Sequence, residues 1–309
     1  MASDIILQYP VYNLENRLLL SAGTVLSDSV LDELVSRAED HPGCFLLQYG
    51  TVKKDLLRFL SEPPYQIIFH DPQQKMEMLR TMERVHLVLP VLRSLDYFKK
   101  YDFHTYRHML MVFALSEMLA KELILGFHTK EPETISSPTH DIGKTCVPLS
   151  ILMKRTPLTK SEFHLLQHHT VAGYVLTSYY LKNSDHIAAR VARDHHERKS
   201  GTGYPRGTSK VDRMAEIVIV SDVYDALISP RPYRPVSYDN RSALEVVTEM
   251  AEKGEVSWDI VKALIAQNRR DKPGIDEFTV SKEKRGRNPI GNLHGITVDD
   301  AGDKQRIVA

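Results

Sequence analysis

The sequence is poor in cysteine. Its 309 residues include only 2 cysteines, Cys44 and Cys146. Two thiols define neither a disulfide framework nor a cysteine-type zinc site, so both are expected to be ordinary reduced thiols. An excess of positive charge is also lacking, because 40 lysines and arginines balance 40 aspartates and glutamates. This balance argues against a nucleic-acid polymer as partner, since such partners are bound through an excess of basic residues.

Long hydrophobic runs are lacking as well. The longest apolar stretch, residues 86–92, contains Pro90 and falls far short of the ~18 residues that a membrane span needs. The first residues, MASDIILQ, have no basic segment followed by an apolar stretch, so no signal peptide is expected. The sequence therefore predicts a cytoplasmic protein without a membrane span, in a reducing compartment.

Histidine, by contrast, is concentrated in one part of the chain. Ten of the 14 histidines lie between residues 104 and 196, and this is where the sequence places the chemistry. An isolated histidine on a helix is usually a surface residue or a satisfied core residue. We expect this of His86, which lies before this region, and of His128, His164 and His186 within it.

Residues 1–72 predict a small α+β domain. Short apolar runs at residues 5–7, 17–20 and 44–47 are typical of strands. Residues 28–38 carry apolar side chains at helical spacing. The segment shows no phosphoacceptor pattern, and we interpret it as a regulatory or partner-binding domain.

Residues 73–268 predict a helical domain. Helices are expected at residues 106–125, 242–253 and 258–267 from the spacing of their apolar side chains. Residues 214–227 fit either a helix or a strand, because β-branched residues fill their centre. The remaining residues, 269–309, are polar and weakly periodic, which predicts an extended or disordered tail.

Two helix starts are predicted beside the densest histidines. Thr159 and Glu162 have the spacing of a capping box, and the helix that they open is expected to run to about residue 181. Ser184 is expected to cap the next helix. That helix is expected to continue through His195 and His196.

Imidazoles and carboxylates in this region indicate a metal site. His140 stands next to Asp141, and His195 next to His196. Asp222 lies in an apolar segment, where a buried carboxylate must be paired or ligated. A donor set of imidazole and carboxylate without thiolate suits iron, manganese or zinc.

Several blocks of the sequence resemble the HD-GYP family. Residues 140–144 read HDIGK, residues 195–205 read HHERKSGTGYP, and residues 221–227 read SDVYDAL, followed by RPYR at 231–234. The resemblance extends over roughly residues 101–267. It implies an all-helical domain that acts as a metal-dependent phosphodiesterase of the bacterial second messenger cyclic di-GMP, here preceded by the small α+β domain.

The resemblance also implies a centre of two divalent metal ions, with iron favoured and manganese as the alternative. The implied ligands are His108, His140, Asp141 and Asp222 around one ion, and Asp141, His169, His195 and His196 around the other. Two cations ~3.5–4 Å apart can activate a water molecule between them. Some members hold a third metal through a glutamate four residues before the first histidine. Here that position is His104, so a two-metal site is favoured; His168 is a neighbour whose role stays open.

The same resemblance names the groups that act on the substrate. Asp141 and Lys144 are assigned to catalysis, and Lys144, Tyr204, Arg231 and Arg234 to contacts with cyclic di-GMP. Arginine suits bidentate contacts to phosphate. In the family, the loop that corresponds to residues 203–205 is associated with contacts to GGDEF diguanylate cyclase domains, which makes such domains candidate partners.

The expected activity is hydrolysis of cyclic di-GMP to linear pGpG, and on to GMP as a further step. One alternative is a weak or inactive receptor that binds metal and nucleotide and signals through protein partners. It is favoured by residues 134–139, TISSPT, which stand where the family has an apolar helix before the histidine–aspartate pair. A phosphohydrolase of another nucleotide and a dimetal oxygenase are two further alternatives.

Overall fold

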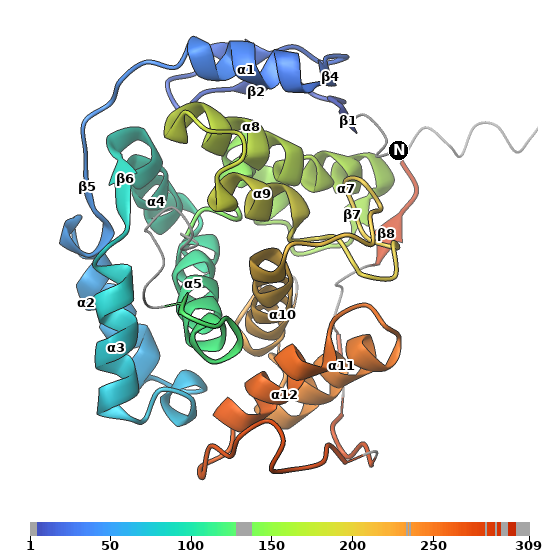
Figure 1. The fold of residues 1–309 in the computed structure, drawn as a ribbon. Helices are drawn as coiled ribbons and strands as arrows, with labels where there is room; N and C mark the ends of the chain where they lie inside the picture. Colours follow the sequence, from blue (N-terminus) through green and yellow to red (C-terminus); the bar gives the residue numbers. More distant parts are fainter. Residues whose placement is uncertain are drawn as a thin grey trace, which may run out of the picture.

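The protein is built around two buried helices. The computed structural model describes residues 5–127, 138–232, 234, 236–281, 283–287, 289–291 and 296–300 (Figure 1). Within them α5 (Phe103–Leu123) packs along α10 (Arg213–Ile228). Both helices are apolar on nearly every side, which is typical of helices that are buried all round. Their side chains form the centre of the hydrophobic core.

Other helices cover this pair. Figure 1 shows α8 and α9 on one side of it and α11 and α12 on the other. α4 and α12 pack on α5, α11 packs on α10, and α8 packs on the short turn η5. The bounds are α4 (Leu89–Tyr101), η5 (Ile142–Cys146), α6 (Leu149–Leu152), α7 (Lys160–Gln167), α8 (His169–Leu181), α9 (Ile187–Asp194), α11 (Asn240–Glu252) and α12 (Trp258–Gln267).

The N-terminal part of the chain mixes short strands and helices. Three antiparallel pairs form, β1 with β4, β2 with β3 and β5 with β6. The bounds are β1 (Ile5–Ile6), β2 (Val11–Tyr12), β3 (Leu18–Leu20), β4 (Val25–Leu26), α1 (Asp28–Ser36), β5 (Gly43–Phe45), η1 (Leu46–Gln48), α2 (Val52–Ser61), η2 (Tyr65–Ile67), α3 (Pro72–Met82) and β6 (His86–Val88). The predicted strands and helix are therefore present among the described residues.

A separate α+β domain is not confirmed. α1 and β2 pack on α8, whereas α2 packs on α5, so the two halves of this segment contact different parts of the helical body. One continuous hydrophobic cluster joins Leu7, Val11 and Leu56 to the residues of α5 and α10. Because the short strands bury their apolar side chains against the helices, this segment shares the helical core. The boundary at residue 72 stays a prediction.

Two expectations about helix ends near the histidines are wrong. The capping box of Thr159 and Glu162 is confirmed, but the helix that it opens ends at Gln167, and α8 starts afresh at His169. The cap of α9 is His186, whose Nδ1 accepts from the backbone N–H of Ala188 at 3.1 Å. Ser184 does not cap it.

Helix α9 ends just before the two adjacent histidines of the site. The helix ends at Asp194, so His195 and His196 follow it. The predicted continuation of the helix through both histidines is therefore wrong, although the backbone of His195 itself keeps a right-handed helical conformation, with φ −64° and ψ −12°.

Residues 214–227 form a helix, which settles the open choice between helix and strand. The side chain of Asp212 accepts from the backbone N–H of Met214 at 2.9 Å and caps α10. Residues 217–220 are fully or nearly fully buried. Packing on every side therefore overrides the β propensity of their branched side chains.

The described part of the C-terminal tail is mostly irregular and lies against the helical body. β8 (Thr297–Val298) pairs in parallel with β7 (Leu158–Thr159). Lys284 forms ion pairs of 3.0 Å with Glu249 and Glu252 on α11. The tail is thus extended, as its composition predicts, but it is held by contacts with the body.

A glycine contact brings η5 against α8. A Cβ atom added to Gly143 would overlap the carbonyl oxygen of His169 and the backbone nitrogen of Gly173, whereas a Cβ on Gly173 would lie 3.4 Å from its nearest neighbours. Gly143→Ala should therefore force the two segments apart and cost about 1–3 kcal/mol of unfolding free energy. Gly173→Ala should be nearly neutral, because the gain in helix propensity offsets a minor contact. Urea unfolding of both variants measures this difference; equal effects would contradict it.

Candidate metal centre

Seven side chains from separate elements meet in the interior. His108 comes from α5, Asp222 from α10 and His169 from the first residue of α8. His140 and Asp141 immediately precede η5, and the remaining two, His195 and His196, follow α9. All are buried except His196, which is partly exposed. These are the seven residues that the sequence predicts as metal ligands.

The first cluster consists of His108, His140 and Asp222, whose donor atoms all lie within 4.8 Å of one another. Nε2 of His108 is 2.9 Å from Oδ1 of Asp222 and 3.4 Å from Nε2 of His140. Two nitrogens and one carboxylate oxygen therefore converge on one point.

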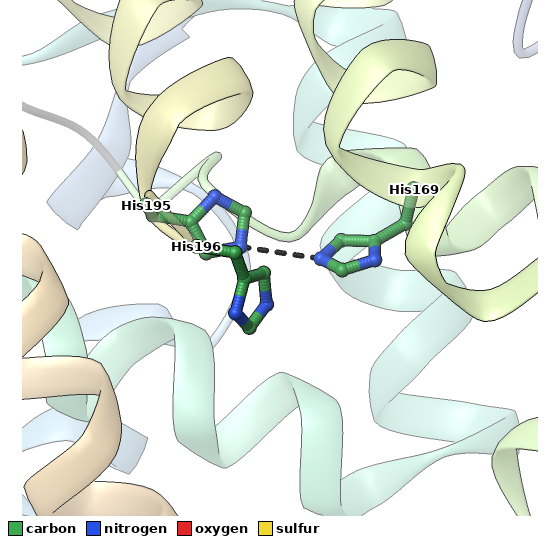
Figure 2. A group of neighbouring side chains, drawn as sticks. All are labelled: His169, His195 and His196. Atoms are coloured by element: carbon green, nitrogen blue, oxygen red, sulfur yellow. Dashed lines mark hydrogen bonds between the residues drawn. The ribbon is translucent and has the colours of Figure 1, made fainter. Parts of the chain in front are cut away.

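The second cluster consists of His169, His195 and His196, with donor atoms within the same 4.8 Å limit. Figure 2 shows the imidazoles of His169 and His195 facing each other, with Nε2 atoms 3.2 Å apart. The ring of His196 lies beside them, with its centroid 5.1 Å from that of His169.

Asp141 lies between the clusters. Its Oδ2 is 3.5 Å from Nε2 of both His108 and His140. Its Oδ1 is 3.4 Å from Nε2 of His169 and 3.8 Å from Nε2 of His195. Each carboxylate oxygen thus faces one cluster, which is the arrangement that a carboxylate bridging two cations requires.

The hydrogen bonds of the second cluster fix the tautomers of its imidazoles. Nδ1 of His169 lies 2.5 Å from the carbonyl oxygen of Leu166, and Nδ1 of His195 lies 2.9 Å from that of Ala192. A carbonyl only accepts, so each Nδ1 carries the proton and donates. In the neutral rings both Nε2 atoms then present lone pairs to each other. Two lone pairs at 3.2 Å need a cation between them, so the donor set fits a metal ion.

Burial keeps these imidazoles neutral. It lowers the pKa of His140 and of His169 to about 3, although Asp141 opposes the shift. Burial also opposes ionisation of Asp141, but Lys144 and the surrounding imidazoles outweigh it and hold the pKa of this carboxyl well below its usual range. Neutral imidazole and ionised carboxylate are the forms that bind metal.

The same shifts predict how the stability of the metal-free protein depends on pH. A buried histidine with a lowered pKa stays neutral in the folded state and takes up a proton on unfolding below its unfolded pKa of 6.5. Stability should therefore fall as the pH decreases from about 6.5 toward 4. His169→Gln should reduce this slope by up to about 1.4 kcal/mol per pH unit, the value for one proton. Urea midpoints across this range measure it; parallel curves for variant and parent would contradict the assignment.

Lys144 supplies the positive charge of the site. It lies in η5, three residues after Asp141, and its Nζ is 2.5 Å from Asp141 Oδ2. The side chain is mostly buried. It fixes one oxygen of the bridging carboxylate and leaves a cation beside both clusters.

The sequence did not predict the roles of a carboxylate and a tyrosine behind the first cluster. Oδ2 of Asp225 accepts from Nδ1 of His108 at 2.6 Å. The hydroxyl of Tyr65 donates to Oδ1 of Asp225 and lies 3.0 Å from Oγ of Ser229. Asp225 and Tyr65 are both fully buried. Asp225 therefore orients His108 as outer partners of metal-bound histidines do.

The loop after His196 is held by a buried glutamate. Glu197 is fully buried, and its two oxygens accept from the backbone N–H groups of Arg206 and Thr208 at 2.7 and 3.0 Å. This closes the loop over residues 198–208. The ring of Tyr204 is stacked on that of His196, with centroids 4.7 Å apart and planes 15° apart. Tyr204 thus lies directly beside the second cluster.

The two arginines assigned to substrate have different surroundings. Arg231 lies 3.7 Å from Asp225 Oδ2, behind the first cluster. Arg234 is buried, and its guanidinium donates to the carbonyl oxygens of Ala226 and Leu227 at 2.7 and 2.8 Å. These bonds make Arg234 a cap for the C-terminal end of α10, and its contact with substrate stays a prediction.

The remaining sequence features lie around the site. Nδ1 of His104 lies 3.0 Å from the carbonyl oxygen of Pro230, one turn of α5 before His108. His168 is buried, and its ring packs edge-on against that of Tyr9. Pro138 is described and buried directly before the site, whereas residues 134–137 and His128 lie outside the described residues.

Comparisons with known proteins agree with this geometry. A sequence model of the HD domain family matches residues 66–256. The chain is 36% identical over 149 residues to a protein of Thermotoga maritima named cyclic di-GMP phosphodiesterase, covering 48% of this chain and 40% of that protein. It is 40% identical over 114 residues to the cyclic di-GMP phosphodiesterase response regulator RpfG of Xanthomonas campestris, covering 36% and 30%.

A third relative is named for another dinucleotide. The 3'3'-cGAMP-specific phosphodiesterase 1 of Vibrio cholerae is 36% identical over 133 residues, which are 42% of this chain and 30% of that protein. The matched segments thus span only 30–40% of the length of these relatives. The family match covers more than half of the present chain and contains all seven clustered side chains. The chain therefore belongs to the HD domain family.

Proposed function

We propose that the protein is a metal-dependent phosphodiesterase that hydrolyses cyclic di-GMP to linear pGpG. The observation that carries the proposal is the position of Asp141, with one carboxylate oxygen toward each cluster of three donors and Lys144 alongside. The names of the relatives from Thermotoga maritima and Xanthomonas campestris support the choice of substrate.

Two divalent ions, iron or alternatively manganese, would be held by the seven side chains. His108, His140 and Asp222 would hold the first, His169, His195 and His196 the second, and Asp141 both. When bound, such a pair supplies an activated water and a Lewis acid that stabilises charge on phosphate. The donor set of imidazole and carboxylate suits either metal.

The chain itself would bind and orient the phosphodiester. Lys144 would place its ammonium beside the attacked phosphate, and Tyr204 would stack against a base. Arg231 is paired with Asp225 behind the first cluster, so its predicted contact with substrate, like that of Arg234, stays a prediction. Water forms the new bond to phosphorus, the bond from phosphorus to the 3' oxygen breaks, and this oxygen leaves with a proton. One water is consumed, and the product is linear pGpG; hydrolysis to GMP would repeat the step.

A substrate panel tests the proposal. Protein loaded with iron or manganese under anaerobic conditions should hydrolyse cyclic di-GMP to pGpG, with a kcat/KM higher than for hydrolysis of any other nucleotide in the panel. The panel includes pGpG, 3'3'-cGAMP and cyclic mononucleotides, resolved by chromatography. A preference for a mononucleotide would overturn the choice of substrate while leaving a phosphohydrolase.

The second candidate substrate is 3'3'-cGAMP. Three relatives from Vibrio cholerae carry that dinucleotide in their names, at 32–36% identity. Lysine and arginine side chains recognise phosphate, which both dinucleotides share. A higher kcat/KM for 3'3'-cGAMP in the same panel would favour this candidate.

Two further proposals concern the cellular location and the protein partners of the chain. Among the described residues no helix is long and apolar enough to cross a bilayer, and we propose a cytoplasmic location. We also propose that the loop of residues 203–205 contacts GGDEF diguanylate cyclase domains. Co-purification with such a domain, compared between the parent and a Tyr204→Ala variant, tests this contact.

A further inference from the structure

A cavity behind the metal centre has no part in the proposed reaction. Its volume is about 560 Å³, within the range of pockets that hold small molecules. Its walls come from three stretches of chain far apart in sequence, residues 9–16, residues 90–97 and residues 145–148, together with Leu165 of α7. It therefore lies where the N-terminal strands meet α4 and the segment after Lys144.

The walls are rich in aromatic rings and carry one available cation. Tyr9, Tyr12 and Tyr97 line the cavity together with Arg93. Arg93 is exposed, and among the residues that the structure describes it has no hydrogen-bond or ion-pair partner. The one carboxylate in the wall, Glu15, already accepts from the hydroxyl of Tyr180 at 2.9 Å.

This composition selects a class of ligand. Tyrosine rings offer flat apolar faces on which a planar ring can stack. A guanidinium binds carboxylate or phosphate through paired hydrogen bonds. A planar aromatic molecule that carries an anionic group satisfies both.

Two parts of the cavity wall adjoin residues that support the metal centre. Thr145 and Cys146 in its wall belong to η5, and they directly follow Lys144, which holds Asp141 Oδ2. The Cys146 thiol lies 3.9 Å from the carbonyl oxygen of Tyr12 on the opposite wall. At the other end, the ring of Tyr9 packs on His168, the residue before His169. A molecule in the cavity would touch Thr145 and Cys146, which follow Lys144 in the chain, and Tyr9, which packs on His168.

We propose that this cavity is a regulatory site for a planar aromatic anion, whose binding alters the affinity of the metal centre. The coupling rests on the proposed metal centre and does not depend on the identity of the nucleotide. Because coupling between two sites is reciprocal, the metal and the aromatic anion must change each other's affinity by the same factor.

The test uses 1-anilinonaphthalene-8-sulfonate, an anion with a planar naphthalene ring, whose binding to the 309-residue chain is followed by fluorescence. Saturable binding is expected, with an affinity about tenfold lower in Arg93→Ala, the loss of one charge-assisted contact. Arg80→Ala, which removes an exposed arginine from α3 outside the cavity, should bind as the parent does. A Tyr12→Ala variant removes one ring and should also bind more weakly.

Two measurements place the probe and show the coupling. In a Cys44→Ser background, saturating probe should slow alkylation of Cys146 by iodoacetamide, because the thiol lies in the cavity wall. The affinity for manganese(II) should change by at least about fivefold with the probe present, the lower end of common coupling factors.

Equal binding of the probe by Arg93→Ala and parent, or unprotected Cys146, would overturn the site. Protection without a change in manganese affinity would overturn the regulation. Failure of cyclic di-GMP hydrolysis would leave both results standing.

Discussion

Asp141→Ala should empty both metal positions at once. Its two oxygens face different clusters, at 3.5 Å from His108 and His140 and at 3.4 Å from His169. The variant removes a ligand shared by two ions, so hydrolysis should fall by more than the roughly 10–100-fold that loss of an outer-shell partner costs. Elemental analysis should find close to two metals per chain in the parent and close to none in the variant.

A matched control separates this effect from a general loss of carboxylate charge. Asp40 is exposed and pairs only with Lys182 on the surface among the described residues, so Asp40→Asn should keep both metals and full turnover. Circular dichroism of Asp141→Ala checks that the fold survives. Retention of two metals per chain in a folded Asp141→Ala variant would show that the carboxylate does not bridge.

Asp225→Ala should destabilise the metal-free protein and weaken only one of the two metal positions. The carboxylate is fully buried and accepts from His108 Nδ1 at 2.6 Å, while Tyr65 donates to its other oxygen. Burial and Arg231 oppose protonation of His108, yet Asp222 and Asp225 outweigh them and raise its pKa. Removing one partner of a buried ion pair costs about 3–5 kcal/mol, which urea unfolding at pH 7 measures.

The metal count gives a second readout for the same variant. His108 belongs only to the first cluster, so Asp225→Ala should lose the first metal and retain the second. Tyr65→Phe removes a single hydroxyl and should cost about 1–3 kcal/mol with both metals retained. Tyr101→Phe, at an exposed tyrosine, serves as control. Loss of both metals in Asp225→Ala, or unchanged stability, would contradict a role confined to His108.

The candidate ligands could be predicted from the sequence because its blocks resemble those of the HD-GYP family, and that resemblance also implies His108 and His169, which lie outside the blocks. HDIGK, HHE and SDVYDAL stand in one order along the chain, and the structure brings all seven predicted residues together. Asp225 stands inside the last of these blocks, but a one-dimensional pattern does not show which of its two aspartates faces inward to a metal and which supports a histidine.

Other features depend on contacts that no local pattern encodes. Tyr65 donates a hydrogen bond to Asp225, which lies 160 residues further along the chain. The sequence around Tyr65 therefore does not indicate this role. Ser184 and His186 are both able to cap a helix, and the local sequence does not show that His186 is the one that caps α9. The expected α+β domain has the predicted strands, but strands of two or three residues cannot bury a core alone, and they complete the core of the helices instead.

We propose that the protein hydrolyses cyclic di-GMP with two ions held on either side of Asp141. The most direct test loads metal-free protein with iron(II) in steps under anaerobic conditions and measures bound metal and released pGpG on the same samples. The structure predicts that the rate of pGpG release increases with the second equivalent of iron(II). The rate should not increase further once two metals are bound per chain. Full release at one metal per chain, or from metal-free protein, would contradict it.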